Sequence, residues 1–244
     1  MRQKLRVLGA VTVVALGAGT VGACDGPWKR TTFEDDAAVP GKITSVRLEN
    51  RSGGIALHGR QGLAKVTLHR SVSYRDHRPD GPTHRVEGGV LVLGGCGDRC
   101  SVGYTADIPA GIPVTGGVSS GAITLSAVGG VRVTASSGRI TLDGTGGPVS
   151  VRTSSGRIRG TGLRGGKIEA RTSNGAIDLA PATPSDVRAQ TSNGAIKVTV
   201  PAGRYRVSAK TSHGGKHIGV ADDPAGAHRL DLTTSNGAIT VKTA

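Results

Sequence analysis

Apolar residues alternate with polar residues along most of this chain, and glycine-centred turns interrupt the alternation. Val131 and Val133 precede one such turn, and Ile140 and Leu142 follow it. A period of two places one set of side chains on the inner face of a strand and the other set on its outer face. Each unit therefore predicts two short strands joined by a corner, with Thr, Ser, Arg and Lys pointing outward.

The corner is itself a repeat: a small polar residue, a glycine, a variable residue and an isoleucine. It recurs at Ser52–Ile55, Ser120–Ile123, Ser137–Ile140, Ser155–Ile158, Asn174–Ile177, Asn193–Ile196 and Asn236–Ile239, with a degraded copy at Ser212–Gly215. From Gly121 onward the glycines lie about 17 to 23 residues apart, a length typical of one solenoid rung. Glycine permits a positive φ at such a bend, and Asn or Ser before it suits the same turn.

The repeat predicts an all-β fold, a single elongated β-solenoid built from about 17–23-residue repeats. An antiparallel β-sandwich with Asn-Gly hairpins is the alternative. The solenoid is favoured because the unit length drifts while the corner motif stays constant. Aromatic residues make up only 2% of the chain and glycine occurs 40 times, so the core should be thin and aliphatic.

The first residues have the composition of an export signal. Arg2, Lys4 and Arg6 are followed by the apolar run Val7–Val21, and Val21-Gly22-Ala23-Cys24 has the form of a lipobox. The apolar run is shorter than the roughly 20 residues that span a bilayer, which disfavours a retained membrane helix. We expect cleavage before Cys24 and lipidation of its thiol, whose acyl chains would hold the protein on the membrane.

These features divide the chain into a lipoprotein signal peptide (residues 1–23), a lipidated cysteine with a flexible tether (24–41) and a repetitive β-solenoid domain (42–244). The tether prediction is based on a polar stretch with Pro and Gly that includes the acidic run Glu34–Asp36. The predicted location is the outer face of the cell membrane. The net charge of +14 at pH 7 falls to +11 on cleavage, so the exported domain stays basic.

Two more cysteines, Cys96 and Cys100, flank three residues of a glycine-rich segment. An even pair outside the cytoplasm usually forms a disulfide, which we predict here. A Cys-x-x-x-Cys metal half-site is the alternative, although no second half with ligand spacing follows nearby. We therefore expect neither a metal nor a cofactor.

Several matches to catalytic motifs coincide with the repeat. Ser119 lies in a Gly-x-Ser-x-Gly sequence and residues 160–165 form Gly-x-Gly-x-x-Gly, but a strand follows each, where a nucleophile or phosphate loop needs a helix. His213 and His217 have a zinc spacing only on a helix, and the two glycines between them disfavour one. We expect turns and surface loops at all three places.

The basic charge is the surface feature with functional content. A group of cationic residues occupies the middle repeats: Arg132, Arg139, Arg152, Arg157, Arg159, Arg164, Lys167 and Arg171. Equivalent rung positions stack in a solenoid, so Arg139 and Arg157, which both follow a corner glycine, should form a cationic ladder near Arg159. Such a ladder would attract anionic wall polymers or lipid headgroups; a solvated basic face that only keeps the protein soluble is the alternative. Nucleic acid is not expected as a partner, because the chain is exported and lacks aromatics for base stacking.

The lipobox, the Gly-Cys-Gly-Asp-Arg-Cys segment at residues 95–100, the Ile-Pro-Ala-Gly-Ile-Pro-Val stretch at 108–114 and the Thr-Ser-Asn-Gly-Ala-Ile repeats resemble the toast-rack family of bacterial adhesin-like proteins, common in high-GC Gram-positive bacteria. The resemblance covers roughly residue 44 to the C-terminus. It implies a β-solenoid outside the cell membrane, linked to adhesion or envelope-stress signalling, with no established catalytic residues to carry over.

The sequence thus predicts a non-enzymatic, membrane-anchored lipoprotein that acts as an adhesin or as a structural module binding envelope polymers. Its partners would be membrane lipid through Cys24 and either anionic cell-wall polymers or a membrane protein. An accessory sensor of envelope stress is the first alternative. A polysaccharide-processing enzyme using Asp143 and Asp178 is the second. The last repeat reaches the C-terminus, so we expect its rung to form an open end that could pair with another protein.

Overall fold

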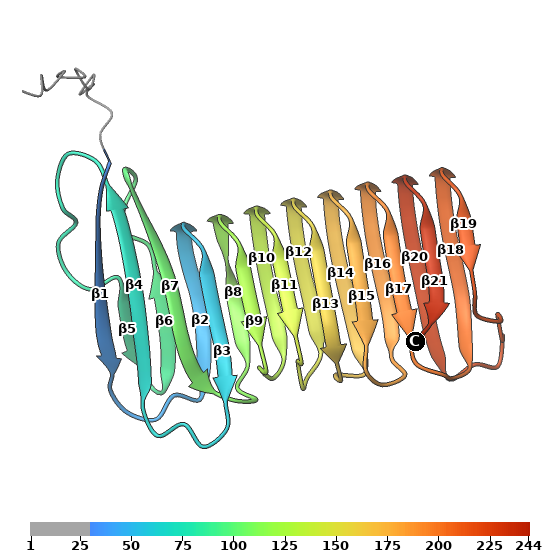
Figure 1. Ribbon diagram of the computed structural model, residues 1–244, viewed down its shortest axis with the longest axis horizontal. Coiled ribbons are helices and arrows are strands. Elements are labelled where there is room, and N and C mark those ends of the chain that lie inside the picture. The colour runs from blue at the N-terminus through green and yellow to red at the C-terminus, as the bar shows by residue number, and fades with distance from the viewer. Residues whose placement is uncertain (1–29) are drawn as a thin grey trace, which may run out of the picture.

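A computed structural model describes residues 30–244, which fold into 21 strands arranged in two sheets (Figure 1). The predicted signal peptide and Cys24 lie outside the described residues. The 11-stranded sheet contains, in spatial order, β1 (Thr31–Val39), β4 (Val66–Tyr74), β7 (Cys100–Pro109), β3 (Ile55–Arg60), β9 (Ile123–Ser126), β11 (Ile140–Asp143), β13 (Ile158–Leu163), β15 (Ile177–Pro181), β17 (Ile196–Val200), β21 (Ile239–Thr243) and β19 (Lys216–Ile218). The 10-stranded sheet contains β18 (Tyr205–His213), β20 (His228–Asn236), β16 (Asp186–Asn193), β14 (Lys167–Asn174), β12 (Val149–Ser155), β10 (Val131–Ser137), β8 (Val114–Ser120), β2 (Ser45–Ser52), β6 (Val90–Gly94) and β5 (His84–Glu87).

The β-solenoid prediction is confirmed. Each rung takes one strand from each sheet, and the corner motif joins them as an arch along the upper edge in Figure 1. Equivalent strands of neighbouring rungs pair in parallel and in register: Val131 lies opposite Val149, and Ile140 opposite Ile158. The antiparallel sandwich is wrong for these repeats, because the two strands of one arch belong to different sheets instead of pairing as a hairpin.

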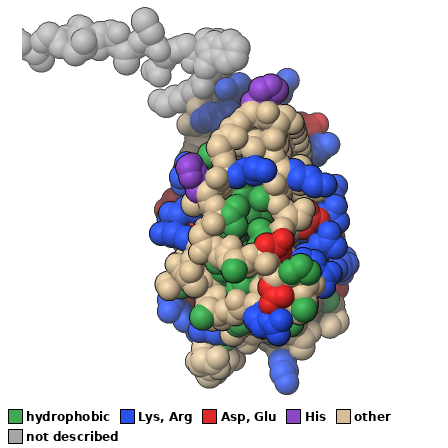
Figure 2. Space-filling view, turned by 90° about the vertical axis from the view of Figure 1, so that its right-hand side faces the viewer, with side chains coloured by type: hydrophobic (Ala, Val, Ile, Leu, Met, Phe, Trp, Pro, Cys, Tyr) green, Lys and Arg blue, Asp and Glu red, His purple; other side chains and the backbone are tan. Residues whose placement is uncertain are grey.

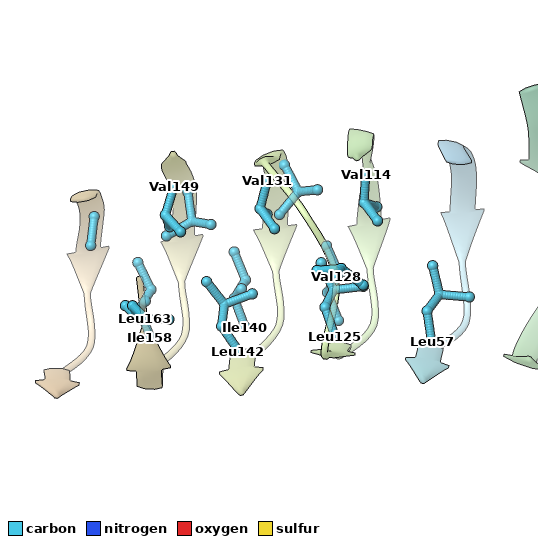
Figure 3. Packing of buried hydrophobic residues seen from close by; sticks show 14 of the residues in the cluster. Leu57, Val114, Leu125, Val128, Val131, Ile140, Leu142, Val149, Ile158 and Leu163 are labelled. Atoms are coloured by element: carbon cyan, nitrogen blue, oxygen red, sulfur yellow. The ribbon is translucent and has the colours of Figure 1, made fainter. Parts of the chain in front are cut away.

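Small aliphatic side chains fill the narrow space between the sheets (Figure 3). Val131 and Val149 of the 10-stranded sheet project toward Ile140 and Ile158 of the other sheet, and each of the four is no more than 3% exposed. The two buried tyrosines occupy opposite ends of the stack. Tyr104 lies in the N-terminal part and Tyr205 in the last rung, each at most 2% exposed. Larger side chains are therefore found where the regular repeat stops.

The corner glycines are required by close stacking between rungs. A Cβ built on Gly175 would lie 2.1 Å from the carbonyl oxygen of Gly156 in the preceding rung, and Gly194 has the same clash with Gly175. Their φ angles of 159° and 158° are close to extended backbone, so a positive φ is not the main reason for glycine here. Inward-facing threonines use the same carbonyls: Thr172 Oγ1 donates a hydrogen bond to Gly156 O at 3.1 Å. Arches can thus stack at strand spacing only without a side chain at this point.

The N-terminal part corrects the tether prediction. Thr31–Val39 forms β1, which pairs antiparallel with β4 along its whole length, and β4 pairs antiparallel with β7. Basic partners in β4 hold the acidic run that suggested a tether. Arg70 Nε donates a hydrogen bond to Asp35 Oδ1 at 2.8 Å, and His69 Nδ1 lies 2.9 Å from Asp36 Oδ1. The folded domain therefore includes β1, and β1 with β4–β7 forms an antiparallel cap over the first rung.

The C-terminal part corrects the prediction of the open end. β18 and β19 form the outermost rung although they precede β20 and β21 in sequence, because β20–β21 inserts between them and β16–β17. Figure 2 looks onto this end, where hydrophobic side chains gather in the middle and Lys and Arg lie on both flanks. The loop after β19 covers part of the edge, since Asp222 Oδ1 accepts a hydrogen bond from Val207 N at 2.8 Å. The degraded corner repeat at Ser212–Gly215 therefore belongs to the terminal rung of the stack.

Candidate anion-binding surface

Arg139 and Arg157 occupy equivalent positions in neighbouring arches, directly after the corner glycine. Ile140 N donates a hydrogen bond to the carbonyl oxygen of Arg157 at 3.0 Å, which fixes the two arginines one strand spacing apart. Arg159 follows in β13, opposite Thr141 on one side and Asp178 on the other. All three arginine side chains are exposed. We call Arg139, Arg157 and Arg159 the arginine ladder.

The arginine ladder has Asp178 as a lateral neighbour of Arg159 but makes no ion pair with the described residues. Within residues 30–244, none of its three guanidinium groups forms an ion pair or a side-chain hydrogen bond. Strand pairing holds the backbones of Arg139 and Arg157 about 4.8 Å apart, so their like-charged guanidinium groups lie on neighbouring rungs and repel one another. An anion that bridges neighbouring guanidinium groups would relieve this repulsion and form charge-assisted hydrogen bonds.

The other basic residues of the middle repeats do not join this cluster, which corrects the expectation of a single cationic group. Arg132, Arg152 and Arg171 lie on the outer face of the 10-stranded sheet. Acidic neighbours offset much of the charge there: Arg171 Nη2 lies 2.5 Å from Glu169 Oε1, and a groove of about 420 Å³ farther along is lined by residues of both signs. The face opposite the ladder is therefore of mixed charge.

A polar ridge runs along the arches beside the ladder, and sequence reasoning did not identify it as a surface. Exposed serines occupy the same arch position in successive rungs: Ser119, Ser136, Ser154, Ser173, Ser192, Ser235 and Ser212. Beside them, Asn193 donates a side-chain hydrogen bond to Asn174 at 2.9 Å, and Asn236 donates to Asn193 at 2.9 Å. The arches thus present donors and acceptors at a regular spacing of about 4.8 Å, as strand pairing dictates.

The residues singled out for other chemistry lie apart. Ser119 lies in β8 and leads into β9 through an arch, while His213 and His217 lie in the two different strands of the last rung. Asp143 accepts a hydrogen bond from Thr161 Oγ1 at 2.9 Å, and β13 separates it from Asp178. In the described part of the chain, no three His, Cys, Asp or Glu side chains gather closely enough to hold a metal ion.

Cys96 and Cys100 are joined by a disulfide, with their Cα atoms 5.5 Å apart. The bridge closes the loop that leads into β7, at the arch edge of the cap. Its enclosed residues include Asp98 and Arg99, whose side chains point to solvent and pair with Arg51 and Asp76 at 2.6 and 2.7 Å. The part of the chain that the structure describes contains no helix long and apolar enough to cross a membrane.

A relationship to a known sequence family lies in the stacked rungs. The sequence model of the Toastrack DUF4097 family matches residues 112–242, which run from just before β8 into β21. The chain belongs to the Toastrack DUF4097 family. The match excludes the antiparallel cap, so the family relationship concerns the parallel rungs that carry the arginine ladder. No curated protein matches the sequence.

Solved structures similar to this Toastrack protein cover most of its length at low identity. A protein named "putative cell adhesion protein" from Clostridium sporogenes shares 12% identity, with a TM-score of 0.39, over 88% of this chain and 100% of its own. A "putative adhesin" from Bacteroides fragilis shares 14% identity, with a TM-score of 0.44, over 88% of this chain and 97% of its own. One from Parabacteroides distasonis shares 13%, with a TM-score of 0.33 and the same two coverages.

Proposed function

We propose that this Toastrack protein is a non-enzymatic binding module, tethered by lipid at Cys24 to the outer face of the cell membrane, that attaches to anionic envelope polymers through its arginine ladder. The observation that carries the proposal is the stacking of Arg139 and Arg157 in adjacent arches, with Arg159 beside them and no carboxylate paired to any of the three. A rigid cationic row of this kind suits a polymer, because successive anionic groups can bind successive rungs.

The solenoid supports binding by position and by rigidity. The arches hold the ladder on hydrogen-bonded backbone, so binding of a polymer orders only the arginine side chains and no backbone. The serine and asparagine ridge runs parallel to the ladder and would donate hydrogen bonds to polymer hydroxyls or phosphates. Together these surfaces would favour a long ligand lying along the solenoid axis over a small molecule in a cleft.

The membrane attachment is tested by replacing Cys24 with Ser. We expect the parent protein to fractionate with membranes and to label with radioactive palmitate, and we expect Cys24→Ser to do neither. Since the apolar run before Cys24 is unchanged in this variant, continued membrane residence without label would show that an uncleaved segment, and not lipid, anchors the chain.

The ladder is tested with the chain from Asp25 onward, which contains all 21 strands of residues 30–244. Binding to polyphosphate and to polyglutamate is measured across a salt series, for the parent and for Arg139→Gln/Arg157→Gln/Arg159→Gln. We expect salt-sensitive binding that the triple variant loses, because added salt screens exposed charges beyond about 3 Å at 1 M. Absence of binding even at low ionic strength would refute the proposal.

A control of equal charge is available on other surfaces of the same rungs. Arg132→Gln/Arg152→Gln/Arg164→Gln removes three exposed arginines outside the ladder. If this control lost as much binding as the ladder variant, net charge and not the ladder would be responsible.

Contact with a membrane protein, as in envelope sensing, is the second candidate, and the open end of the stack favours it. β18 and β19 each pair with a strand on one side only, and Ile218 in β19 is the one large hydrophobic residue exposed in the described chain, at 37%. Crosslinking in intact cells from a photoreactive residue at position 218 should trap a membrane protein under this hypothesis; recovery of no such partner would eliminate it.

A further inference from the structure

The chain enters the described fold at the arch edge, the edge of the solenoid along which the corner motifs lie. β1 is antiparallel to β4, β4 is antiparallel to β7, and β7 is parallel to β3, so β1 runs in the same direction as β3. Because β3 begins directly after a corner, β1 also begins at the arch edge. Strand pairing places Ile55, the first residue of β3, level with Asp35, and Thr31 lies four residues farther toward this edge (Figure 1).

The length of chain before β1 limits which surface can reach the membrane. This step rests on the proposed function, in which lipid at Cys24 anchors the protein. Six peptide units join Cys24 to Arg30, and they span about 20 Å at most, since one extended residue covers roughly 3.3–3.6 Å. The ten residues of β7 span about 33 Å between the arch edge and the opposite edge. The opposite edge is therefore too far from the anchor to rest on the same membrane, whereas the arch edge can.

The arches carry no carboxylate in the regular part of the stack. The arch between β8 and β9 and each later arch of the described chain consist of Ser, Asn, His, Gly, Ala and Arg. Acidic side chains lie instead on the sheet faces, with Glu169 and Asp231 on one face and Asp143 and Asp178 on the other. An anionic surface that met these arches would thus meet the arginine ladder without opposing negative charge from the arches.

The cap contributes the attachment point at this edge and not the attraction. Its exposed arginines are matched by carboxylates: Arg51 Nη1 lies 2.6 Å from Asp98 Oδ1, and Arg99 Nη1 lies 2.7 Å from Asp76 Oδ2. Exposed pairs of this kind leave little net charge to draw an anion. The cationic groups that can turn toward a membrane at the arch edge are therefore those of the ladder.

We propose that the arch edge lies on the membrane that holds Cys24 and that the arginine ladder binds the phosphates of anionic lipid headgroups there. This deepens the proposed function by naming lipid as a ligand of the ladder. Guanidinium groups bind phosphate oxygens through charge-assisted hydrogen bonds, and the serine and asparagine ridge adds donors at the same edge. The anchor makes this contact intramolecular, so a modest attraction per arginine is enough to orient the solenoid with its long axis along the membrane.

The orientation is tested with the lipidated protein in phosphatidylcholine vesicles that carry a headgroup-linked quencher, with or without phosphatidylglycerol. A fluorophore is attached through Ser173→Cys on the arch edge or through Thr183→Cys in the turn after β15, at the opposite edge; both positions are exposed. We expect phosphatidylglycerol to increase quenching several-fold at position 173 and to leave position 183 unchanged. Equal quenching at the two positions, or no effect of phosphatidylglycerol, would overturn the proposed orientation.

The role of the ladder is tested by sedimenting the chain from Asp25 onward, which lacks the anchor, with the same two kinds of vesicle. We expect partition onto the phosphatidylglycerol vesicles to fall about a hundredfold in Arg139→Gln/Arg157→Gln/Arg159→Gln, because each arginine at an anionic surface contributes about fivefold. Partition that is unchanged in this variant would exclude the ladder as the lipid contact.

The control of equal charge, Arg132→Gln/Arg152→Gln/Arg164→Gln, should lower partition less than about threefold, because these side chains project from the 10-stranded sheet or from the turn after β13 and are screened from the vesicle by salt. Equal losses in the two variants would show that net charge, and not the ladder, draws the protein to lipid.

These outcomes are distinguishable from failure of the proposed function. If the ladder binds polyphosphate but phosphatidylglycerol changes neither quenching nor partition, the ladder binds a polymer and the membrane orientation is wrong. If the parent binds neither polyphosphate nor vesicles, both proposals fail. If Cys24→Ser shows that lipid does not anchor the chain, sedimentation of the unanchored chain still decides whether the ladder binds anionic headgroups.

Discussion

Replacement of Gly175 by alanine tests the physical basis of the stack. The new Cβ would lie 2.1 Å from the carbonyl oxygen of Gly156 and 2.6 Å from its carbonyl carbon, about 1 Å or more inside a normal contact. Because both atoms belong to backbone, the two arches must separate. That separation breaks three corner hydrogen bonds that join the rungs: Gly156 N to Asn174 O at 2.9 Å, Ile158 N to Ala176 O at 3.0 Å and Thr172 Oγ1 to Gly156 O at 3.1 Å.

The expected loss in the free energy of unfolding is about 3–4 kcal/mol: three hydrogen bonds at roughly 1 kcal/mol each, with some loss of packing beneath them. Unfolding in urea, followed by circular dichroism of the β signal, measures the loss. Gly166→Ala is the matched control, since Gly166 has a φ of 70° and nothing within 4 Å of the added Cβ. That variant should cost only the left-handed backbone strain, about 1–2 kcal/mol.

The two variants distinguish two reasons for glycine: close approach of neighbouring backbone at Gly175 and a left-handed φ at Gly166. If Gly175→Ala lost no more stability than Gly166→Ala, close approach between rungs would not be what requires glycine at the corners. Gly54→Ala adds a second reference, because its Cβ would meet nothing closer than 3.5 Å. We expect that substitution to change stability by less than about 0.5 kcal/mol, as ordinary surface substitutions do.

Three further predictions concern polar side chains. Thr172→Val should cost about 1 kcal/mol by removing the hydroxyl that binds an arch carbonyl, whereas Thr145→Val should be neutral or stabilising in the same urea assay, because the buried Thr145 hydroxyl has no partner among the described residues. Tyr104→Phe should cost about 1–3 kcal/mol, since the hydroxyl approaches two backbone carbonyls at 2.7 and 2.8 Å; a loss below 0.5 kcal/mol, roughly the scale of a surface change, would contradict this. The hydrogen bond from Arg70 holds the pKa of Asp35 below its usual value, so the pair should stabilise the cap above about pH 4 and lose this contribution as the pH falls through the lowered pKa. Asp35→Asn should therefore flatten the acid limb of the stability profile, and an unchanged limb would count against the pair.

The repeat in the sequence predicts part of the candidate anion-binding surface. The ladder could be predicted because Arg139 and Arg157 follow the same corner motif, and stacking of equal positions follows from the repeat. The same period of two also places Arg132 and Arg152 on the outer face of the opposite sheet, away from the ladder.

The sequence by itself determined the strands, the corners, the inward-facing aliphatic residues and the parallel stack, because a period of two and a glycine arch are local properties that each rung repeats. Only the tertiary structure decided that the acidic stretch Glu34–Asp36 belongs to a strand, since its partners in β4 lie more than thirty residues away. It also decided that β20–β21 inserts beneath β18–β19. Every rung presents nearly the same edge to its neighbours, so the local pattern cannot fix the order of the rungs. The imperfect corner at His213 and Gly214 suits an end rung better than an interior one, but it indicates the position of its rung only once all the rungs are stacked.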